Sequence, residues 1–248
     1  MPFVPDLTDP RYVDEVGWFL YHEKYDRDKF GGSYDAERRA YSRLLLEEVT
    51  NSLGQEPTWL QDKTVVSIGC GCSGDLITFP ARAKIAIDPL LSVYQQLGLV
   101  MADEVGSPTV YLSISAEELP LLADYAHLVI CRNALDHMHH PAAALKEIQR
   151  ILNKDGILFL SVDVGGTPTP DEPTVFSAES LKALLLQQQF EIVSCVRDEQ
   201  PHSSWRDSSI RITARKKSRS DLTLDKEDVL RRYTARSAMP DNGTDRRR

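Results

Sequence analysis

Short apolar runs alternate with helical windows between residues 57 and 217. The runs lie at 64–69, 84–88, 109–114, 127–131 and 157–162. Windows with helical spacing lie at about 74–82, 91–102, 117–123 and 141–152. This alternation is typical of a doubly wound α/β fold, in which parallel strands form one sheet and helices cover both of its faces.

Two more strand candidates, at 190–196 and 209–214, follow a helical window at about 178–188. The polar joint between them is too short for the crossover helix that a parallel pair requires, so we predict that they pair antiparallel. The expected sheet is therefore seven-stranded, Rossmann-like and mostly parallel, with the last strand antiparallel.

Residues 9–53 have helical spacing, and a Phe-Gly-Gly-Ser turn at 30–33 separates two apolar stripes. We predict two helices that form an N-terminal helical cap over residues 1–56, ahead of the α/β domain over 57–217. Residues 218–248 are charged and poor in apolar side chains. They predict a charged C-terminal tail that is partly disordered.

The 248 residues carry a formal net charge of −8 that is unevenly distributed. Residues 214–248 hold 11 Lys and Arg against 6 Asp and Glu, so the preceding chain holds 18 against 31. Proteins that bind nucleic acid need clustered basic side chains. The acidic body therefore argues against nucleic acid and favours a small-molecule partner.

No apolar stretch approaches the roughly 20 residues that span a bilayer, and the N-terminus lacks the pattern of a signal peptide. We therefore predict no membrane segment and no export. Cysteines stand at positions 70, 72, 131 and 195 without a CxxC spacing, which favours reduced thiols and a cytoplasmic location. The sequence does not predict the oligomeric state.

A glycine-rich turn follows the first predicted strand. Gly69, Gly71 and Gly74 have G-x-G-x-x-G spacing, and Asp88 ends the next strand. Such a turn lets a ligand approach the backbone, and the carboxylate can accept hydrogen bonds from both hydroxyls of a ribose. The pattern predicts an adenosine-type cofactor, and its spacing fits both a nicotinamide dinucleotide and S-adenosylmethionine.

Three later segments resemble the class I S-adenosylmethionine-dependent methyltransferase superfamily, of the small-molecule type. Residues 114–120, Ile-Ser-Ala-Glu-Glu-Leu-Pro, resemble the family's G-D-A-E-x-L-P segment, which brackets adenine. Residues 127–137 resemble its fourth-strand segment, and 154–160 resemble its L-K-P-G-G turn into the fifth strand. The resemblance covers about residues 63–217 and implies S-adenosylmethionine as the cofactor.

The resemblance also implies a set of cofactor-binding residues. They are Gly69, Cys70, Gly71, Gly74, Asp88, Pro89, Ser115, Ala116, Glu117, Arg132 and Asn133. Two positions depart from the family pattern, because Ser67 and Ser115 stand where the family commonly has acidic residues. Backbone amides and the serine hydroxyls would then have to replace those charges.

The implied reaction is methyl transfer to a small organic acceptor, with O-methylation favoured. His137 matches the histidine of the family's E-H pair and lies just past the fourth strand, so it is the predicted catalytic residue. It would act as a base on a hydroxyl acceptor, or else as a structural hydrogen-bonding group. The predicted substrate contacts are Tyr21, His22 and His140.

Neither candidate metal cluster has the expected ligands. Cys70 and Cys72 lack further Cys or His partners for zinc. Asn133, Asp136 and His137 occupy the places of a metal site in some quinone-pathway O-methyltransferases, but Asn133 would supply an amide where a hard divalent ion prefers a carboxylate. The sequence therefore predicts no bound metal.

Two other functions stay open. The domain could bind S-adenosylmethionine without transferring its methyl group and serve recognition or assembly, with Ser67 and Ser115 as signs of relaxed chemistry. An NAD-dependent oxidoreductase is disfavoured, because no Tyr-x-x-x-Lys pair follows the fourth strand.

Overall fold

The computed structural model describes residues 8–29, 34–72, 74–100, 103–199, 201–202 and 206–217. The tail expected over 218–248 lies outside the described residues. Within the described residues, no helix has both the length and the apolar character needed to cross a membrane.

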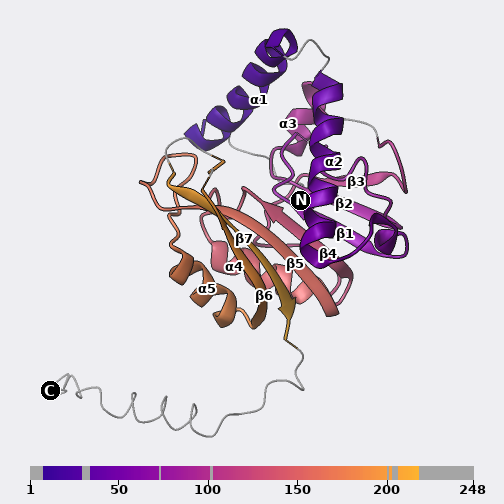
Figure 1. The fold of residues 1–248 in the computed structure, drawn as a ribbon. Helices are drawn as coiled ribbons and strands as arrows, with labels where there is room; N and C mark the ends of the chain where they lie inside the picture. The colour runs from indigo at the N-terminus through magenta and orange to yellow at the C-terminus, as the bar shows by residue number, and fades with distance from the viewer. Residues whose placement is uncertain are drawn as a thin grey trace, which may run out of the picture. The chain divides into compact units, whose positions relative to one another are not determined.

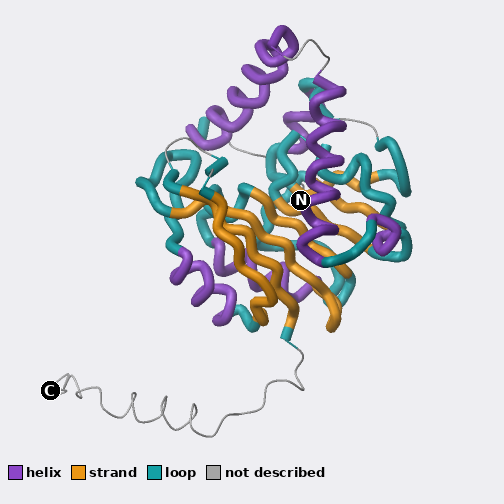
Figure 2. The backbone as a smooth tube through the Cα atoms, viewed as in Figure 1, coloured by secondary structure: helices purple, strands orange, loops and turns teal. Residues whose placement is uncertain are grey.

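A seven-stranded sheet forms the centre of the described fold (Figures 1 and 2). Its strands are β1 (Thr64–Ile68), β2 (Ala83–Ile87), β3 (Thr109–Leu112), β4 (Ala126–Arg132), β5 (Leu152–Val164), β6 (Phe190–Asp198) and β7 (Ser208–Lys216). They lie in the order β3-β2-β1-β4-β5-β7-β6. The pairs among β1 to β5 are parallel, and β7 is antiparallel to both β5 and β6. The predicted mostly parallel sheet with one antiparallel strand near its end is confirmed.

Helices cover both faces of this sheet. They are α1 (Pro10–Lys29), α2 (Tyr34–Leu53), α3 (Leu91–Gln96), α4 (Pro141–Ile151) and α5 (Ala178–Gln187), with a short 3-10 helix η1 (Pro57–Leu60). Successive side chains of a strand point to opposite faces. In β4, Leu128 and Ile130 accordingly pack with α2, whereas Val129 and Cys131 pack with α4 and α5. The helix α2 is therefore part of the main core.

The helices expected at 74–82 and 117–123 are wrong, because both segments are turns and loops. Proline interrupts both, at positions 80 and 120. Side chains of α4 bind the backbone of the second segment instead. Glu147 accepts the Leu119 N–H at 3.0 Å, and the Arg150 guanidinium donates to the Leu119 and Leu121 carbonyls. Tertiary contacts thus satisfy groups that a helix would have paired internally.

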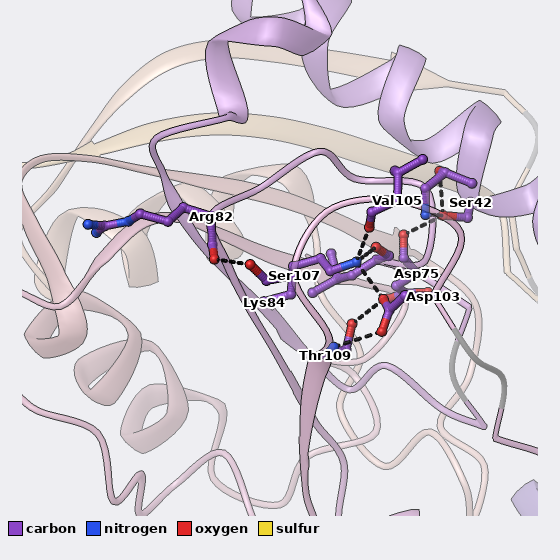
Figure 3. A network of polar contacts seen from close by, with 10 residues as sticks. Ser42, Asp75, Arg82, Lys84, Asp103, Val105, Ser107 and Thr109 are labelled. Atoms are coloured by element: carbon purple, nitrogen blue, oxygen red, sulfur yellow. Dashed lines mark hydrogen bonds and ion pairs between the residues drawn. The ribbon is translucent and has the colours of Figure 1, made fainter.

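The first of these segments is held by a buried polar network (Figure 3). The Lys84 ammonium donates to Asp103 at 2.5 Å and to the carbonyl oxygens of Leu76 and Val105. On α2, the Ser42 hydroxyl donates to the Asp75 carbonyl at 2.9 Å. These bonds hold the backbone of the segment that follows the glycine turn, and they thereby help to fix the position of the turn.

Candidate cofactor and acceptor site

The glycine turn lies where the direction of strand order reverses, between β1 and its neighbours β2 and β4. Open α/β sheets bind ligands at such a switch point, at the carboxyl ends of the strands. Gly69 has a φ of +67°, and a Cβ on it would lie 2.2 Å from the Ala134 Cβ. Only glycine therefore fits between β1 and the loop after β4.

Asp88 follows β2 and ties the glycine turn to the next strand. One carboxylate oxygen accepts the Gly71 N–H at 3.0 Å, and the other accepts the Leu90 N–H at 2.8 Å. The side chain is buried, and this burial raises its pKa to about 6. The carboxylate also lines the cavity described next, with lone pairs left for further donors.

A cavity of about 300 Å³ opens beside this turn. Nine of the residues predicted for the site line it, namely Gly69, Asp88, Pro89, Ser115, Ala116, Glu117, Asn133, His137 and His140. The structure thus brings together residues from the ends of β1, β2 and β4 and from the loop after β3. The cavity contains both the predicted ribose contact and the predicted catalytic histidine.

Five other predicted residues lie elsewhere. Cys70, Gly71 and Gly74 belong to the turn but do not line the cavity. Arg132 donates to the Tyr41 hydroxyl at 2.8 Å on the α2 side, and Tyr21 is exposed on α1. The side chain of His22, the third predicted substrate contact, lies outside the described residues.

Carboxylates stand close to the two serines that depart from the family pattern. The Ser67 hydroxyl donates to the Asp75 carboxylate at 2.6 Å. The Ser115 hydroxyl donates to the carboxylate of Glu117, which lines the cavity. A carboxylate is therefore hydrogen-bonded to each of the two serines.

Sequence reasoning placed α1 at the substrate site through Tyr21 and His22 but missed the helix face that lines the cavity. Tyr12 and Glu15 line it, and Phe19 on the same helix packs beside the glycine turn. Positions 12, 15 and 19 lie three and four residues apart, so they share one helix face, and this spacing was the available signal. The helix α1 therefore contributes side chains to one side of the cavity.

Glu15 forms the closest charged contact of the predicted catalytic residue. One oxygen of Glu15 lies 4.0 Å from His137 Nδ1. Desolvation raises the pKa of Glu15 to about 7, although His137 opposes that rise. A carboxyl whose pKa is close to neutral pH and an imidazole thus share one wall of the cavity.

Next to His137 lie two further acidic groups, Asp136, which the sequence analysis considered as a metal ligand, and Glu172, which it did not foresee. Asp136 is fully buried, and burial raises its pKa to about 8. Glu172, from the loop after β5, is also buried and forms an ion pair of 2.6 Å with Arg206. One ligand atom each from Asp136, His137 and Glu172 lie within 4.8 Å of one another.

Comparisons with known proteins bear on the fold and on the kind of domain. Residues 66–160 match a family described as a methyltransferase domain. The chain is also 26% identical to the tRNA U34 carboxymethyltransferase of Campylobacter lari. The aligned 104 residues cover 41% of this chain and 35% of that protein. The match thus spans about a third of the length of this curated relative.

Solved structures share the fold at low sequence identity. The 1,6-didemethyltoxoflavin-N1-methyltransferase of Burkholderia thailandensis, solved with S-adenosylhomocysteine, has a TM-score of 0.53 at 19% identity, over 87% of this chain and 93% of that one. A SAM-dependent methyltransferase of Methanosarcina mazei has a TM-score of 0.52 at 16% identity, over 63% and 93%. The cyclase SpnF has a TM-score of 0.53 at 18% identity, over 71% and 80%.

The structural likenesses establish the fold, and the family match covers the glycine turn, Asp88 and His137. Residues 66–160 therefore match a methyltransferase domain, and the chain has the fold of S-adenosylmethionine-dependent methyltransferases.

Proposed function

We propose that this chain transfers the methyl group of S-adenosylmethionine to a hydroxyl group of a small organic acceptor. The cavity carries this proposal, because it joins Asp88 and the Ser115–Glu117 segment to the Glu15 and His137 pair. Its volume of about 300 Å³ suits small ligands. An adenosyl group and a small acceptor can therefore meet within one site.

The residues present fit the cofactor. Asp88 would accept the ribose hydroxyls, since its two oxygens keep lone pairs after binding the backbone amides. Ser115, Ala116 and Glu117 would border the adenine. Gly69 would allow the amino-acid part to approach the backbone, with Asn133 beside it.

Methyl transfer is an in-line displacement. The lone pair of the acceptor oxygen forms the new bond to the methyl carbon, the electrons of the C–S bond remain on sulfur, and the hydroxyl proton goes to the protein. Holding the acceptor behind the methyl group in a dry cavity supplies much of the rate. The pair of His137 and Glu15 is the proposed proton acceptor, because both groups line that cavity.

The charge of the cavity disfavours an anionic acceptor. Its lining includes Glu15, Asp88, Glu117 and Asp171, and no Lys or Arg among the described residues joins them. Repulsion between these carboxylates and an anionic acceptor would weaken its binding. The Campylobacter lari relative is named for tRNA, and a polyanion of that kind lacks a basic partner in this cavity.

Isotope transfer tests the proposal. The purified chain is incubated with methyl-labelled S-adenosylmethionine and fractions of a neutral metabolite extract, and labelled products are identified by mass spectrometry. We expect a labelled methoxy compound, and a large loss of rate in His137→Ala and Glu15→Gln. Asp14→Asn, on the outer side of α1, is the matched control and should keep the wild-type rate.

The second candidate is a domain that binds the cofactor without transferring its methyl group. Ser67 and Ser115, which replace acidic residues, are the observation in its favour. Calorimetry with S-adenosylhomocysteine separates the candidates. Tight binding without transfer to any fraction favours the binding-only role, whereas a labelled product excludes it.

A further inference from the structure

We propose that Asp136, His137 and Glu172 bind a divalent transition-metal ion directly behind the cavity. The proposal deepens the proposed function, because His137 belongs to both the metal cluster and the acceptor wall. The ion would be a structural and positioning element of the site, on the side of His137 that faces the protein interior.

Unpaired polar atoms in the interior point to a missing ligand. Asp136 is 0% exposed, and neither of its carboxylate oxygens has a hydrogen-bond partner among the described residues. His137 Nε2 is buried and without a partner in the same part of the chain. A buried carboxylate without a partner is costly, and native proteins rarely keep one.

The spacing of the three side chains suits an ion between them. Their ligand atoms lie within 4.8 Å of one another, while no hydrogen bond joins the Asp136 carboxylate or His137 Nε2 to a neighbour in the described structure. Metal–ligand bonds of about 2.0–2.2 Å place two ligands of one ion up to about 4.4 Å apart. Direct hydrogen bonds would instead bring the same atoms to about 3 Å.

The third ligand is held in place by its own contacts. Arg206 Nε donates to Glu172 Oε2 at 2.6 Å, and Arg206 Nη2 donates to the Glu172 carbonyl at 3.0 Å. The Thr174 N–H donates to the Asp136 carbonyl at 3.1 Å, which joins the loop of Glu172 to the loop of Asp136. Both ligand loops are therefore fixed before an ion arrives.

Charge and ligand type identify the class of ion. Two buried carboxylates face one guanidinium, so a cation is the group that would complete the charge balance of the cluster. Imidazole is a ligand that first-row ions such as Mn²⁺, Co²⁺ and Zn²⁺ accept, whereas Mg²⁺ and Ca²⁺ prefer oxygen ligands only. The cluster therefore favours a transition-metal ion over Mg²⁺.

An ion bound to Nε2 would determine which ring nitrogen of His137 carries the proton, and therefore the role of this side chain in the cavity. The ring proton would then be on Nδ1, which lies 4.0 Å from Glu15. Metal-bound histidines commonly donate their other N–H to a carboxylate, which orients the ring. His137 would hold Glu15 of α1 in place, and the Glu15 carboxylate would take the proton of the acceptor hydroxyl.

Cobalt titration tests the site. The full chain, without a polyhistidine tag and stripped with a chelator, is titrated with Co²⁺ while visible d–d absorption is recorded. We expect one bound Co²⁺ per chain, displaced by Zn²⁺ but not by a similar concentration of Mg²⁺. Asp136→Asn and Glu172→Gln should weaken binding at least about tenfold, the scale of losing one ligand contact.

Matched variants separate binding at this cluster from binding elsewhere on the chain. Asp155→Asn alters an exposed carboxylate outside the cluster and the cavity and should keep the Co²⁺ affinity. His139→Ala with His140→Ala removes an exposed histidine pair, and a loss of the signal there would mean adventitious binding and overturn the proposal. So would unchanged binding in a folded Asp136→Asn, or no Co²⁺ binding by the wild type.

S-adenosylhomocysteine affinity is measured on the same samples. It reports whether each variant is folded, and it separates this proposal from the proposed function. A wild type that binds S-adenosylhomocysteine but no Co²⁺ overturns the metal site alone. A wild type that binds Co²⁺ but no S-adenosylhomocysteine supports the metal site and contradicts the proposed function. If Asp136→Asn does not fold, His137→Asn replaces it as the ligand variant.

Discussion

Phe19 and Gly71 meet in direct contact between α1 and the glycine turn. A Cβ on Gly71 would lie 2.6 Å from Phe19 Cζ, and Gly71 has a φ of +60°. Phe19 also stacks edge-on against Tyr94, with ring centroids 5.3 Å apart. The glycine is therefore required both by its backbone conformation and by the contact with α1. The position of α1 thus depends on its packing against the glycine turn.

Gly71→Ala should destabilise the protein by about 2 kcal/mol, with roughly half from the left-handed backbone and half from displacing the Phe19 ring. Urea unfolding of the single and double variants measures both parts. In a Phe19→Ala background, Gly71→Ala should cost only about 1 kcal/mol, because the ring is gone. Gly17→Ala is the control on α1, where nothing lies within 4 Å, and it should be neutral or slightly stabilising. Equal costs in both backgrounds would contradict the contact.

S-adenosylhomocysteine affinity should fall as the pH is lowered from about 7 to about 5. Burial raises the pKa of Asp88 to about 6, and the nearby Asp75 raises it further, while the Leu90 and Gly71 amides oppose the shift. The ionised form accepts ribose hydroxyls more strongly, so protonation should cost about tenfold in affinity at one pH unit below the pKa.

Asp88→Asn should bind weakly and without this pH dependence, and Asp171→Asn should retain it. Glu15 and Tyr94 also lie near Asp88, so Glu15→Gln is measured alongside. The stability of the ligand-free protein depends on pH in the opposite direction from the affinity. Because the folded pKa lies above the usual 3.8, Asp88 contributes stability below that value and loses it as the pH rises through about 6. An affinity that is flat across this range would exclude Asp88 as the ribose contact.

The sheet and much of the cofactor wall could be predicted because local patterns encode them. The apolar runs of β1 and β4 are buried on both faces, and the glycine spacing with Asp88 reflects a turn and a strand end that are close in sequence. The helix predictions for 74–82 and 117–123 were wrong because the groups that bind their backbones, such as Ser42 and Glu147, come from helices distant in sequence.

The remaining part of the site depends on contacts that no local pattern carries. Glu15 reaches the cavity only because α1 packs over the glycine turn, and its helix spacing resembles that of any packed helix. Glu172 joins Asp136 through the path of the loop after β5, where residues 167–174 are Thr-Pro-Thr-Pro-Asp-Glu-Pro-Thr and have no helix or strand pattern. Three-dimensional packing was needed to place both carboxylates.

Ser67→Ala should destabilise the protein by about 2 kcal/mol. The Ser67 hydroxyl donates to the buried Asp75 carboxylate at 2.6 Å, and burial already raises the pKa of Asp75. Removing a hydrogen bond to a charged group leaves that charge poorly solvated. Thermal unfolding compares Ser67→Ala with Asp75→Asn, which keeps a neutral acceptor for the hydroxyl. A Ser67→Ala protein as stable as the wild type would show that Asp75 does not depend on this bond.

Lys84→Met should cost about 3 kcal/mol, because it leaves Asp103 and two carbonyl groups without their cation (Figure 3). The Lys84 side chain is fully buried, and Asp103 also accepts the Thr109 N–H at 2.7 Å, so the pair links β2 to the chain entering β3. Lys63→Met is the matched control, since its partner Asp62 is exposed and such surface pairs contribute little. Urea midpoints measure both variants. If Lys84→Met and Lys63→Met lose the same small amount, the buried network does not support the cofactor turn, which would then depend on its bonds to Ser42, Ser67 and Asp88.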